Sequence, residues 1–562
     1  MPSPPPSPLA RAWAWAVRHP VLVLALVVAV QVLPTLGSRD YWAFDEVRHA
    51  DALREVLDGG HWFSLHLNGH PYPDKPPVYF WLVAGIARLI GTDGPPAFFL
   101  ASGLGGFLFL LATWALARTT LARHRPGLAL LAPLLVTATP LYQLLLRTTR
   151  MDLLFGALIV FSEVLLGLGL ARRRAWRPVV GGFALAGLAT LVKGPVGLAF
   201  PLGTVVLYVL WQGRARRLLA GDVLTGLAAA LALIAAWAVG LGLTEGWPYL
   251  DSLVRGQVIG RMLAAHKHSQ PFWFFLAALP VAWIPWSALV IAPGRDLFRL
   301  AGWRDRWRRA WAARREDRTG RAWLGWAFLA GLLLLSLATS KLFIYLMPLL
   351  GPLAVLSAAS LVRLDGRAAA RTFLLMGLGT ILVGLALPVL AARVPWPQVH
   401  VRGAWPVGAL LVLTGLLVLL WRHRPLGRPL GLLLAGFTVA NLLAGLWVAP
   451  SFDPVMSPRA QAEVIARYAD RGYAPLVFKV YPGTYTYYAG RNLPETRDPA
   501  ILRDHLQTHE RVLVATARKY WERHAAMLEG LEIVHEQRIE GRPFVVAVRG
   551  AAARPGSGEE AR

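Results

Sequence analysis

Long apolar runs recur along almost the whole chain and limit how it can fold. A helix of about 20 apolar residues crosses a membrane core of about 30 Å. Hydrophobic residues make up 56% of the 562 residues, and charged residues only 16%. This pattern predicts an all-α polytopic membrane protein rather than a large soluble enzyme. About thirteen spans are expected, at 15–36, 97–117, 127–146, 151–170, 179–192, 195–211, 221–243, 272–292, 322–339, 342–361, 371–391, 405–421 and 428–449.

The basic residues predict how these spans are oriented. The chain has 58 Lys and Arg against 32 Asp and Glu, a net charge of +26. They lie in short bursts between apolar runs, which is the positive-inside pattern and excludes nucleic acid as a partner. The apolar run 78–90 is too short to span. If it forms an interfacial helix, most of the basic bursts lie on the same side of the membrane as the N-terminus. We expect a multi-pass protein of the cell inner (plasma) membrane with a cytoplasmic N-terminus, and with 39–96 and everything after 450 extracytoplasmic.

The character of the chain changes after residue 450. Residues 451–550 contain strand-like runs at 476–480, 511–516 and 544–548, with helix-like segments at 458–468, 499–507 and 519–528. Alternating signals of this kind predict a small C-terminal extracytoplasmic α/β domain with an open sheet. The aromatic stretch YPGTYTYYAGR within it either faces an active-site cavity or belongs to a stabilising cap. Residues 1–450 then form the transmembrane domain, and 551–562 a disordered tail.

The polar segment 40–81 stands out between the first two spans. Its apolar spacing predicts an amphipathic helix that starts near Phe44 and ends at Gly59-Gly60. On this helix Asp45, Arg48 and His49 share one face. The following Pro-Asp-Lys-Pro-Pro holds its lysine on rigid, extended backbone. A helix whose charges simply face water is the plainer interpretation, but it does not account for a lysine bracketed by prolines.

The ionisable residues expected at the outer membrane face predict a kind of chemistry. They include carboxylates and several cations, but no cysteine, so thiolate metal sites and disulfides are excluded. Lys and Arg stabilise the charge of a departing lipid-linked phosphate, and a carboxylate can take the proton of an acceptor hydroxyl. We therefore expect transfer of a sugar from a polyprenyl-phosphate donor to a lipid or protein acceptor.

Two motifs in the right order carry a resemblance to a known family. FDEVRHADALREVL followed by LNGHPYPDKPP resembles the first extracytoplasmic loop of membrane glycosyltransferases of the aminoarabinose-transferase and protein O-mannosyltransferase type, and KLFIYLMP resembles a later motif. His49 stands where Tyr is usual, Val47 replaces a common Pro, and Asp74 replaces Glu. The resemblance implies a GT-C fold and inversion of the anomeric centre. It implies a catalytic role for Asp45 and Asp152, and donor-phosphate binding by Arg48, Lys75, Arg261 and Tyr345.

The resemblance also raises the question of a divalent metal. Some members hold an ion with the acid before the lysine of the Pro-bracketed turn, a later His and an acid in the tail. Asp74 fits the first position, and His266 and His268 can replace the second, although a His-x-His pair at a loop edge is more often solvated or interfacial. No other cofactor is expected.

Two other functions stay open at this stage. A lipid or sugar transporter or flippase would line its path with intramembrane charges, and a receptor would bind through its C-terminal part. Transporter sites usually lie near the membrane midplane, whereas the expected spans hold almost no central ionisable residue, Glu163 excepted. The acceptor is left open between a lipid A-like glycolipid, a protein hydroxyl and an envelope glycan.

Overall fold

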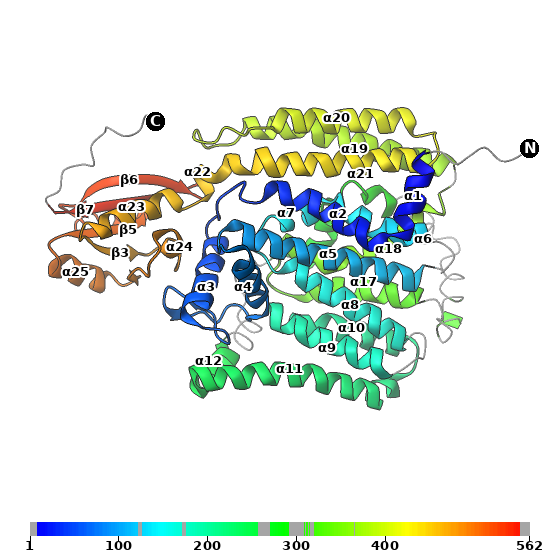
Figure 1. Cartoon of the computed structure of the whole chain (residues 1–562), viewed down its shortest axis with the longest axis horizontal. Helices are drawn as coiled ribbons and strands as arrows, with labels where there is room; N and C mark the ends of the chain where they lie inside the picture. The colour runs from blue at the N-terminus through cyan, green and yellow to red at the C-terminus, as the bar shows by residue number, and fades with distance from the viewer. Residues whose placement is uncertain are drawn as a thin grey trace, which may run out of the picture.

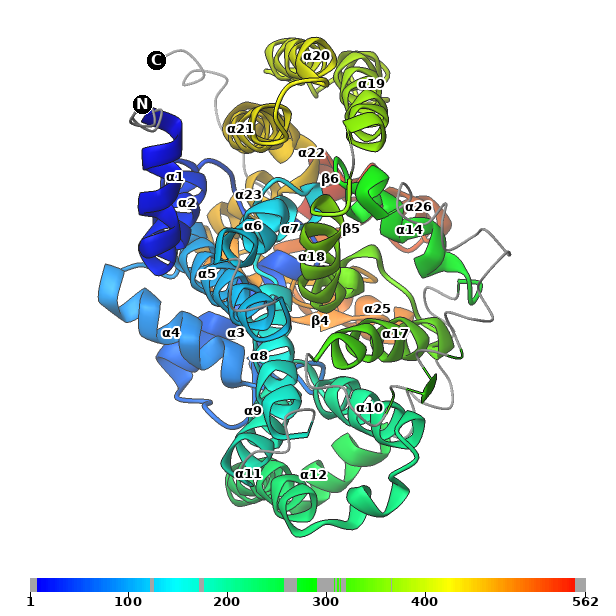
Figure 2. The same cartoon turned by 90° about the vertical axis from the view of Figure 1, so that its right-hand side faces the viewer.

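The structure is a computed structural model, and it describes residues 8–121, 126–170, 176–256, 270–290, 308, 311–312, 314, 320–364 and 366–550. Long helices lie side by side in a bundle, with a small sheet beyond one end (Figure 1). In Figure 2, which looks along the bundle, α11 and α12 lie at one side of it and α19 and α20 at the other. Most of the basic segment 295–321 and the tail 551–562 lie outside the described residues.

The helical part agrees with the predicted class. Within the described ranges, seven helices are long and apolar enough to cross a membrane, or up to nine if two bent pairs are single spans. Further helices occupy other predicted spans but are shorter or less apolar, so the count of thirteen is supported only in part. The seven are α5 (Pro95–Thr120), α8 (Asp152–Leu170), α11 (Gly221–Glu245), α18 with the turn before it (Phe343–Leu361), α19 (Gly366–Ala392), α20 (Ala404–Trp421) and the helical run Gly427–Met456 that begins with α21 (Gly427–Leu443). The others include α9 (Trp176–Lys193), α10 (Val196–Trp211) and α17 (Arg321–Leu337).

Three predicted spans are not continuous helices in the structure, and each is interrupted near a proline. The span 15–36 is divided between α1 (Pro8–Arg18) and α2 (Pro20–Val32), with a bend of 103°. The span 127–146 is α6 (Pro126–Thr137) and α7 (Pro140–Leu146), bent by 69°. In 272–292, α14 (Phe274–Ala282) ends shortly before Pro285. Proline has no N–H for the helical hydrogen bond, and its ring clashes with the preceding turn.

The polar segment folds as its pattern predicts, into α3 (Asp45–Gly59), which Gly60 ends in a left-handed conformation at φ 70°. The helix crosses the end of the bundle beside α4 (Val78–Ile90) (Figure 1). Arg48, His49 and Asp51 are all buried. The interpretation in which this helix simply turns its charges to water is therefore wrong for these three residues, while Asp58 at its end is exposed.

The sheet beyond α3 has five strands in the order β4-β3-β5-β7-β6. The first three are parallel neighbours, and β7 pairs antiparallel with both β5 and β6. The predicted strands correspond to β3 (Ala474–Phe478), β5 (Val512–Ala517) and β7 (Arg542–Arg549), and the predicted helices to α23 (Arg459–Asp470), α25 (Pro499–Thr508) and the short α26 (Arg518–Arg523). The edge strands β4 (Glu495–Thr496) and β6 (Glu532–Ile539) were not predicted.

Hydrogen bonds fasten the sheet region to the first loop. The Asn68 side chain donates to the Leu493 carbonyl at 2.7 Å and accepts from the Leu493 N–H at 2.8 Å. Trp42 Nε1 donates to Asp453 at 2.7 Å. Asn68 is buried, so leaving these groups unpaired would cost about 1–3 kcal/mol each. The contacts fix the sheet over the N-terminal end of α3.

Candidate active site

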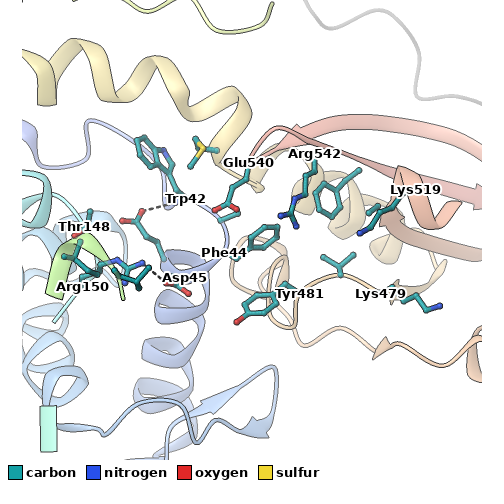
Figure 3. Close-up of a pocket in the computed structure, with 18 of the residues that line it drawn as sticks. Trp42, Phe44, Asp45, Thr148, Arg150, Lys479, Tyr481, Lys519, Glu540 and Arg542 are labelled. Carbon is teal, nitrogen blue, oxygen red and sulfur yellow. Dashed lines mark hydrogen bonds and ion pairs between the residues drawn. The ribbon is translucent and has the colours of Figure 1, made fainter. Parts of the chain in front are cut away.

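A cavity of about 1050 Å³ lies between the end of the helix bundle and the sheet (Figure 3). The start of α3 and the α7–α8 junction form one side of it. The turn η5 (Phe343–Leu346) contributes a second wall, and strands and loops of the sheet complete it. Segments that are more than 400 residues apart in the sequence, such as Asp45 and Arg542, therefore face the same space.

Asp45, the predicted catalytic carboxylate, is the first residue of α3 and lines this cavity. Arg150 donates to its Oδ2 at 2.7 Å, and the Asp45 side chain stays 46% exposed. Burial acts to raise the pKa of Asp45, but nearby cationic groups, Arg150 and Lys75 among them, outweigh burial and hold that pKa below its ordinary value. The carboxylate is thus ionised, oriented and open to the cavity.

His49 lies one turn along α3 and is fully buried. Its Nδ1 lies 2.9 Å from Thr149 Oγ1 and 3.1 Å from the Thr149 carbonyl. Burial first, and then the charge of Lys75, lower the pKa of His49 to about 3. The imidazole is therefore neutral, and its Nδ1–H can donate to the Thr149 carbonyl. This contact ties α3 to the segment that carries Arg150.

Lys75 comes from the Pro-bracketed turn and is half-buried. No residue in the described part of the chain forms a hydrogen bond or an ion pair with its ammonium group. Burial and the nearby charge of Lys193 lower the pKa of Lys75, while Asp45 opposes them. A partly dehydrated ammonium group without a counter-ion is a ready anion-binding group.

Arg48, expected to bind the same anion, has protein partners instead. Its guanidinium lies 4.7 Å from the ring centroid of Tyr72 and 4.4 Å from that of Tyr481, and it donates to the Tyr481 hydroxyl at 3.1 Å. Arg48 Nη2 also lies 3.8 Å from Asp74 Oδ2. Tyr481 belongs to the aromatic stretch of the C-terminal region and lines the cavity. The interpretation in which this stretch faces the cavity thus holds for Tyr481.

Asp152 and Tyr345, the other predicted site residues, meet at Lys193. Asp152 is buried at the start of α8 and accepts a hydrogen bond from the Lys193 ammonium group. That ammonium group also lies 4.5 Å from the ring centroid of Tyr345. Neither Asp152 nor Tyr345 lines the cavity. Asp152 therefore has a cationic partner of its own, Lys193. The pair acts on the charge of Lys75 and lies outside the lining of the cavity.

The remaining predicted residues are not brought together by the described part of the chain. Arg261, His266 and His268 lie outside it. Asp74 is partly exposed near Arg48, as stated above. A metal held by Asp74, His266 and His268 therefore stays a prediction.

The sheet side of the cavity carries a group of cations that sequence reasoning missed. Figure 3 shows Lys519 and Arg542 across the cavity from Asp45 and Arg150. Their positions in the sequence give no sign of this, because they belong to different elements of a region taken to be a separate domain. The basic residues on this side are Lys479, Arg497, Lys519, Arg523 and Arg542.

Solved structures identify the class of the fold. The ArnT crystal structure from Cupriavidus metallidurans bound to undecaprenyl phosphate aligns with a TM-score of 0.74 over 95% of this chain and 98% of that one, at 19% identity. Its apo form aligns with a TM-score of 0.72 over 96% of this chain and 100% of that one, at 20% identity. The fold is therefore the predicted GT-C fold of membrane glycosyltransferases, and the chain is a multi-pass membrane protein.

Sequence relatives narrow the class to a family. Residues 74–240 match the family described as dolichyl-phosphate-mannose-protein mannosyltransferase. The undecaprenyl phosphate-alpha-4-amino-4-deoxy-L-arabinose arabinosyl transferase of Pseudomonas aeruginosa (strain LESB58) is 30% identical over 445 residues, 76% of this chain and 75% of that relative. The protein of the same description from Aeromonas salmonicida is 31% identical over 387 residues, 67% of this chain and 66% of that relative. The chain belongs to this family of arabinosyl transferases, as the resemblance predicted.

Proposed function

We propose that this protein transfers a sugar from a polyprenyl-phosphate donor to an anionic acceptor, with inversion, in the cavity at the end of the bundle. The observation that carries the proposal is the arrangement at that end. An ionised carboxylate opens into the cavity. Lys75 is not among the lining residues, but it is half-buried, feels the charge of that carboxylate, and has no partner among the described residues. The named relatives use an undecaprenyl-phosphate donor, and the donor class is carried over from them. Membership of their family disfavours the transporter alternative.

Lys75 holds the donor phosphate in this proposal. Its ammonium group needs an anion, and a phosphate monoester leaving group supplies one. The neighbouring Lys193 and Arg150 add positive charge, as their effect on the pKa of Lys75 indicates. Arg48 contacts Tyr72 and Tyr481 and holds these side chains in place next to the site. Fixed cations in a poorly hydrated site stabilise the negative charge that develops as the bond to the sugar breaks.

Asp45 acts on the acceptor. The acceptor oxygen attacks the anomeric carbon from the face opposite the phosphate, the carbon–oxygen bond to the phosphate breaks, and polyprenyl phosphate leaves with the bonding electrons. If the oxygen belongs to a hydroxyl, its proton passes to Asp45 late in the step, since a carboxylate of low pKa is a weak base. If the oxygen belongs to an ionised phosphate, no proton moves and Asp45 orients the reacting groups. Asp152 is the poorer candidate because it is buried and does not line the cavity, whereas Asp45 opens into it.

The cations on the sheet side select the acceptor. Lys479, Lys519 and Arg542 face a cavity whose other wall carries the reactive carboxylate. Such a surface attracts a phosphate or carboxylate group on the acceptor and repels a cationic one. A phosphorylated glycolipid of the lipid A kind fits this wall better than an uncharged protein hydroxyl does.

The reaction takes place on the outer face of the inner membrane in this proposal. The positive-inside distribution of the basic bursts supports that orientation, and so does the lack of soluble nucleotide sugars outside the cytoplasm. The cavity, α3 and the sheet are then all extracytoplasmic.

Donor turnover tests the proposal. Purified protein is incubated with a polyprenyl-phosphate sugar and an anionic glycolipid acceptor, and free polyprenyl phosphate is measured. We expect release that depends on the acceptor and falls in Lys75→Ala, whereas Arg402→Ala, which removes an exposed cation from the loop after α19, leaves it unchanged. Transport of the lipid without any release of polyprenyl phosphate would overturn the proposal.

A further inference from the structure

A second cluster of chemically active side chains lies away from the cavity, where the first loop meets the end of α11. Trp237 Nε1 donates to the Phe63 carbonyl at 3.0 Å. The Phe63 ring lies against Gly240, where an added Cβ would come within 2.3 Å of it. Only glycine allows this approach, so residues 61–66 are held closely against α11. Figure 1 shows the loop below α3 reaching the α11–α12 corner.

His61, His66 and Glu245 converge at this contact. Among the described residues they form a group whose possible ligand atoms all lie within 4.8 Å of one another. His66 Nε2 is 3.8 Å from Glu245 Oε1. The rings of His61 and His66 are stacked with centroids 3.6 Å apart and an angle of 25° between planes. His66 is buried, and the other two are partly exposed.

The hydrogen bonding of His66 prepares it as a ligand. Its Nδ1 lies 3.2 Å from the Ser64 carbonyl, which can only accept, so Nδ1 carries the proton. Nε2 then presents its lone pair toward Glu245. A carbonyl behind a metal-bound imidazole is the usual way in which proteins fix the ring and its tautomer.

We propose that His61, His66 and Glu245 bind a divalent transition-metal ion of the zinc class, with water as the fourth ligand. Two imidazoles and one carboxylate match the ligands that Zn²⁺ takes, whereas Mg²⁺ and Ca²⁺ prefer oxygen ligands. Tetrahedral bonds of about 2.0–2.1 Å place ligand atoms about 3.3–3.5 Å apart. The distance of 3.8 Å between His66 and Glu245 therefore needs a small closure, and His61 must also rotate out of its stack with His66.

An ion pair without metal explains the arrangement less well. At 3.8 Å the His66 and Glu245 atoms are beyond hydrogen-bond distance. A divalent ion between His66 Nε2 and Glu245 removes the repulsion between the lone pair and the carboxylate. His61 reaches the same ion once its side chain rotates out of the stack, because imidazole lone pairs lie in the ring planes and the two planes are nearly parallel. Glu55 adds negative charge within reach of His66.

The site fastens the first extracytoplasmic loop to α11, and it shares no residue with the metal site expected at Asp74, His266 and His268. It also uses no residue that lines the cavity. The role is structural: the ion joins a peripheral helix to the loop that carries Lys75. Binding is therefore expected to raise the melting temperature.

Zinc binding by the full-length protein, purified without a polyhistidine tag, tests the site. The protein is stripped with a chelator and titrated with Zn²⁺ against a chromophoric indicator, with bound metal counted by mass spectrometry. We expect one tight equivalent, and a loss of at least about tenfold in affinity in His61→Ala and Glu245→Gln, as even residues behind a metal ligand contribute about 10–100-fold. His70→Ala, an exposed histidine of the same loop, is the matched control and keeps the site.

Three results would overturn the inference. The first is that the wild type binds no Zn²⁺ tightly. The second is that Zn²⁺ binding is unchanged in both His61→Ala and Glu245→Gln. The third is that Asp74→Asn loses Zn²⁺ binding while those two variants keep it. The third would place the ion at the other predicted site. Among the described residues His61 stacks on His66 but forms no hydrogen bond, so His61→Ala stays informative even if His66→Ala does not fold.

Discussion

Replacement of Asp45 by Asn separates catalysis from folding. Asn keeps the size and hydrogen-bonding reach of the side chain but cannot take up a proton or carry a charge. Loss of a general base lowers turnover by about 10²–10⁴-fold, which corresponds to about 2.7–5.4 kcal/mol of activation free energy. The lost ion pair with Arg150 matters far less for the fold, because both side chains are partly exposed. Pairs of this kind contribute about 0–1 kcal/mol to stability.

The assay is single-turnover release of polyprenyl phosphate, with donor affinity and melting temperature measured on the same samples. We expect Asp45→Asn to bind the donor and melt almost as the wild type does, and to lose turnover. Asp152→Asn is the matched comparison. It leaves the partly buried Lys193 without its counter-ion, and breaking a buried pair costs about 3–5 kcal/mol. This variant should therefore be unstable as well as inactive.

One pattern would refute the assignment of Asp45. If Asp45→Asn transfers sugar at nearly the wild-type rate, while Asp152→Asn is folded and inactive, the base is Asp152. The cavity-facing position of Asp45 would then reflect only its ion pair with Arg150.

Three further predictions follow from the same geometry. Because the pKa of Lys75 is lowered, Lys75 loses its proton at a pH below the ordinary lysine pKa of about 10.4. Donor affinity should fall as the pH rises through that range, and Lys75→Arg should move the fall to higher pH. Reversing the charge of the acceptor wall in the double variant Lys519→Glu/Arg542→Glu should raise the acceptor KM about tenfold or more with little change in donor affinity, whereas Arg503→Glu, an exposed charge on α25 outside the cavity, should change neither. A reporter placed after residue 550 should be found outside the cytoplasm and one within 295–321 inside, and finding both on one side would contradict the proposed orientation.

Local sequence patterns predicted much of the fold, because each depends on neighbouring residues. The helix from Asp45 to Gly59 follows from its apolar spacing and its terminal glycines. The three strands that were predicted are apolar and mostly buried, whereas β6 is an edge strand in which Glu532, Glu536 and Arg538 alternate with less polar residues. Its pairing with β7 supplies the stability that its composition does not. Prolines mark the interruptions at Pro20, Pro140 and Pro285 in the sequence. A count of apolar residues does not detect these interruptions, because it ignores the missing N–H of proline.

The pairing of charges at the site could not be predicted in the same way. Arg150 and Lys193 are ionisable residues next to apolar runs, a position that a contact with lipid headgroups also explains. Which carboxylate each one meets depends on how α3 lies against the α7–α8 junction, and no local pattern encodes that. The result is a division of roles: Arg150 pairs with Asp45, and Lys193 with Asp152. The cationic wall was missed for the same reason.

This division of charges explains why a lysine is left over. Asp45 and Asp152 each have a cationic partner, and Arg48 is enclosed by two tyrosines near Asp74. Lys75 lies among these groups with no counter-ion in the described part of the chain, so the site as built carries an excess positive charge next to an ionised carboxylate. A dianionic or monoanionic phosphate that enters beside Lys75 removes the excess, and its departure after transfer restores it. In the proposed reaction, the charge of Lys75 that binds the donor also retains the product, polyprenyl phosphate, so we expect Lys75 to slow product release.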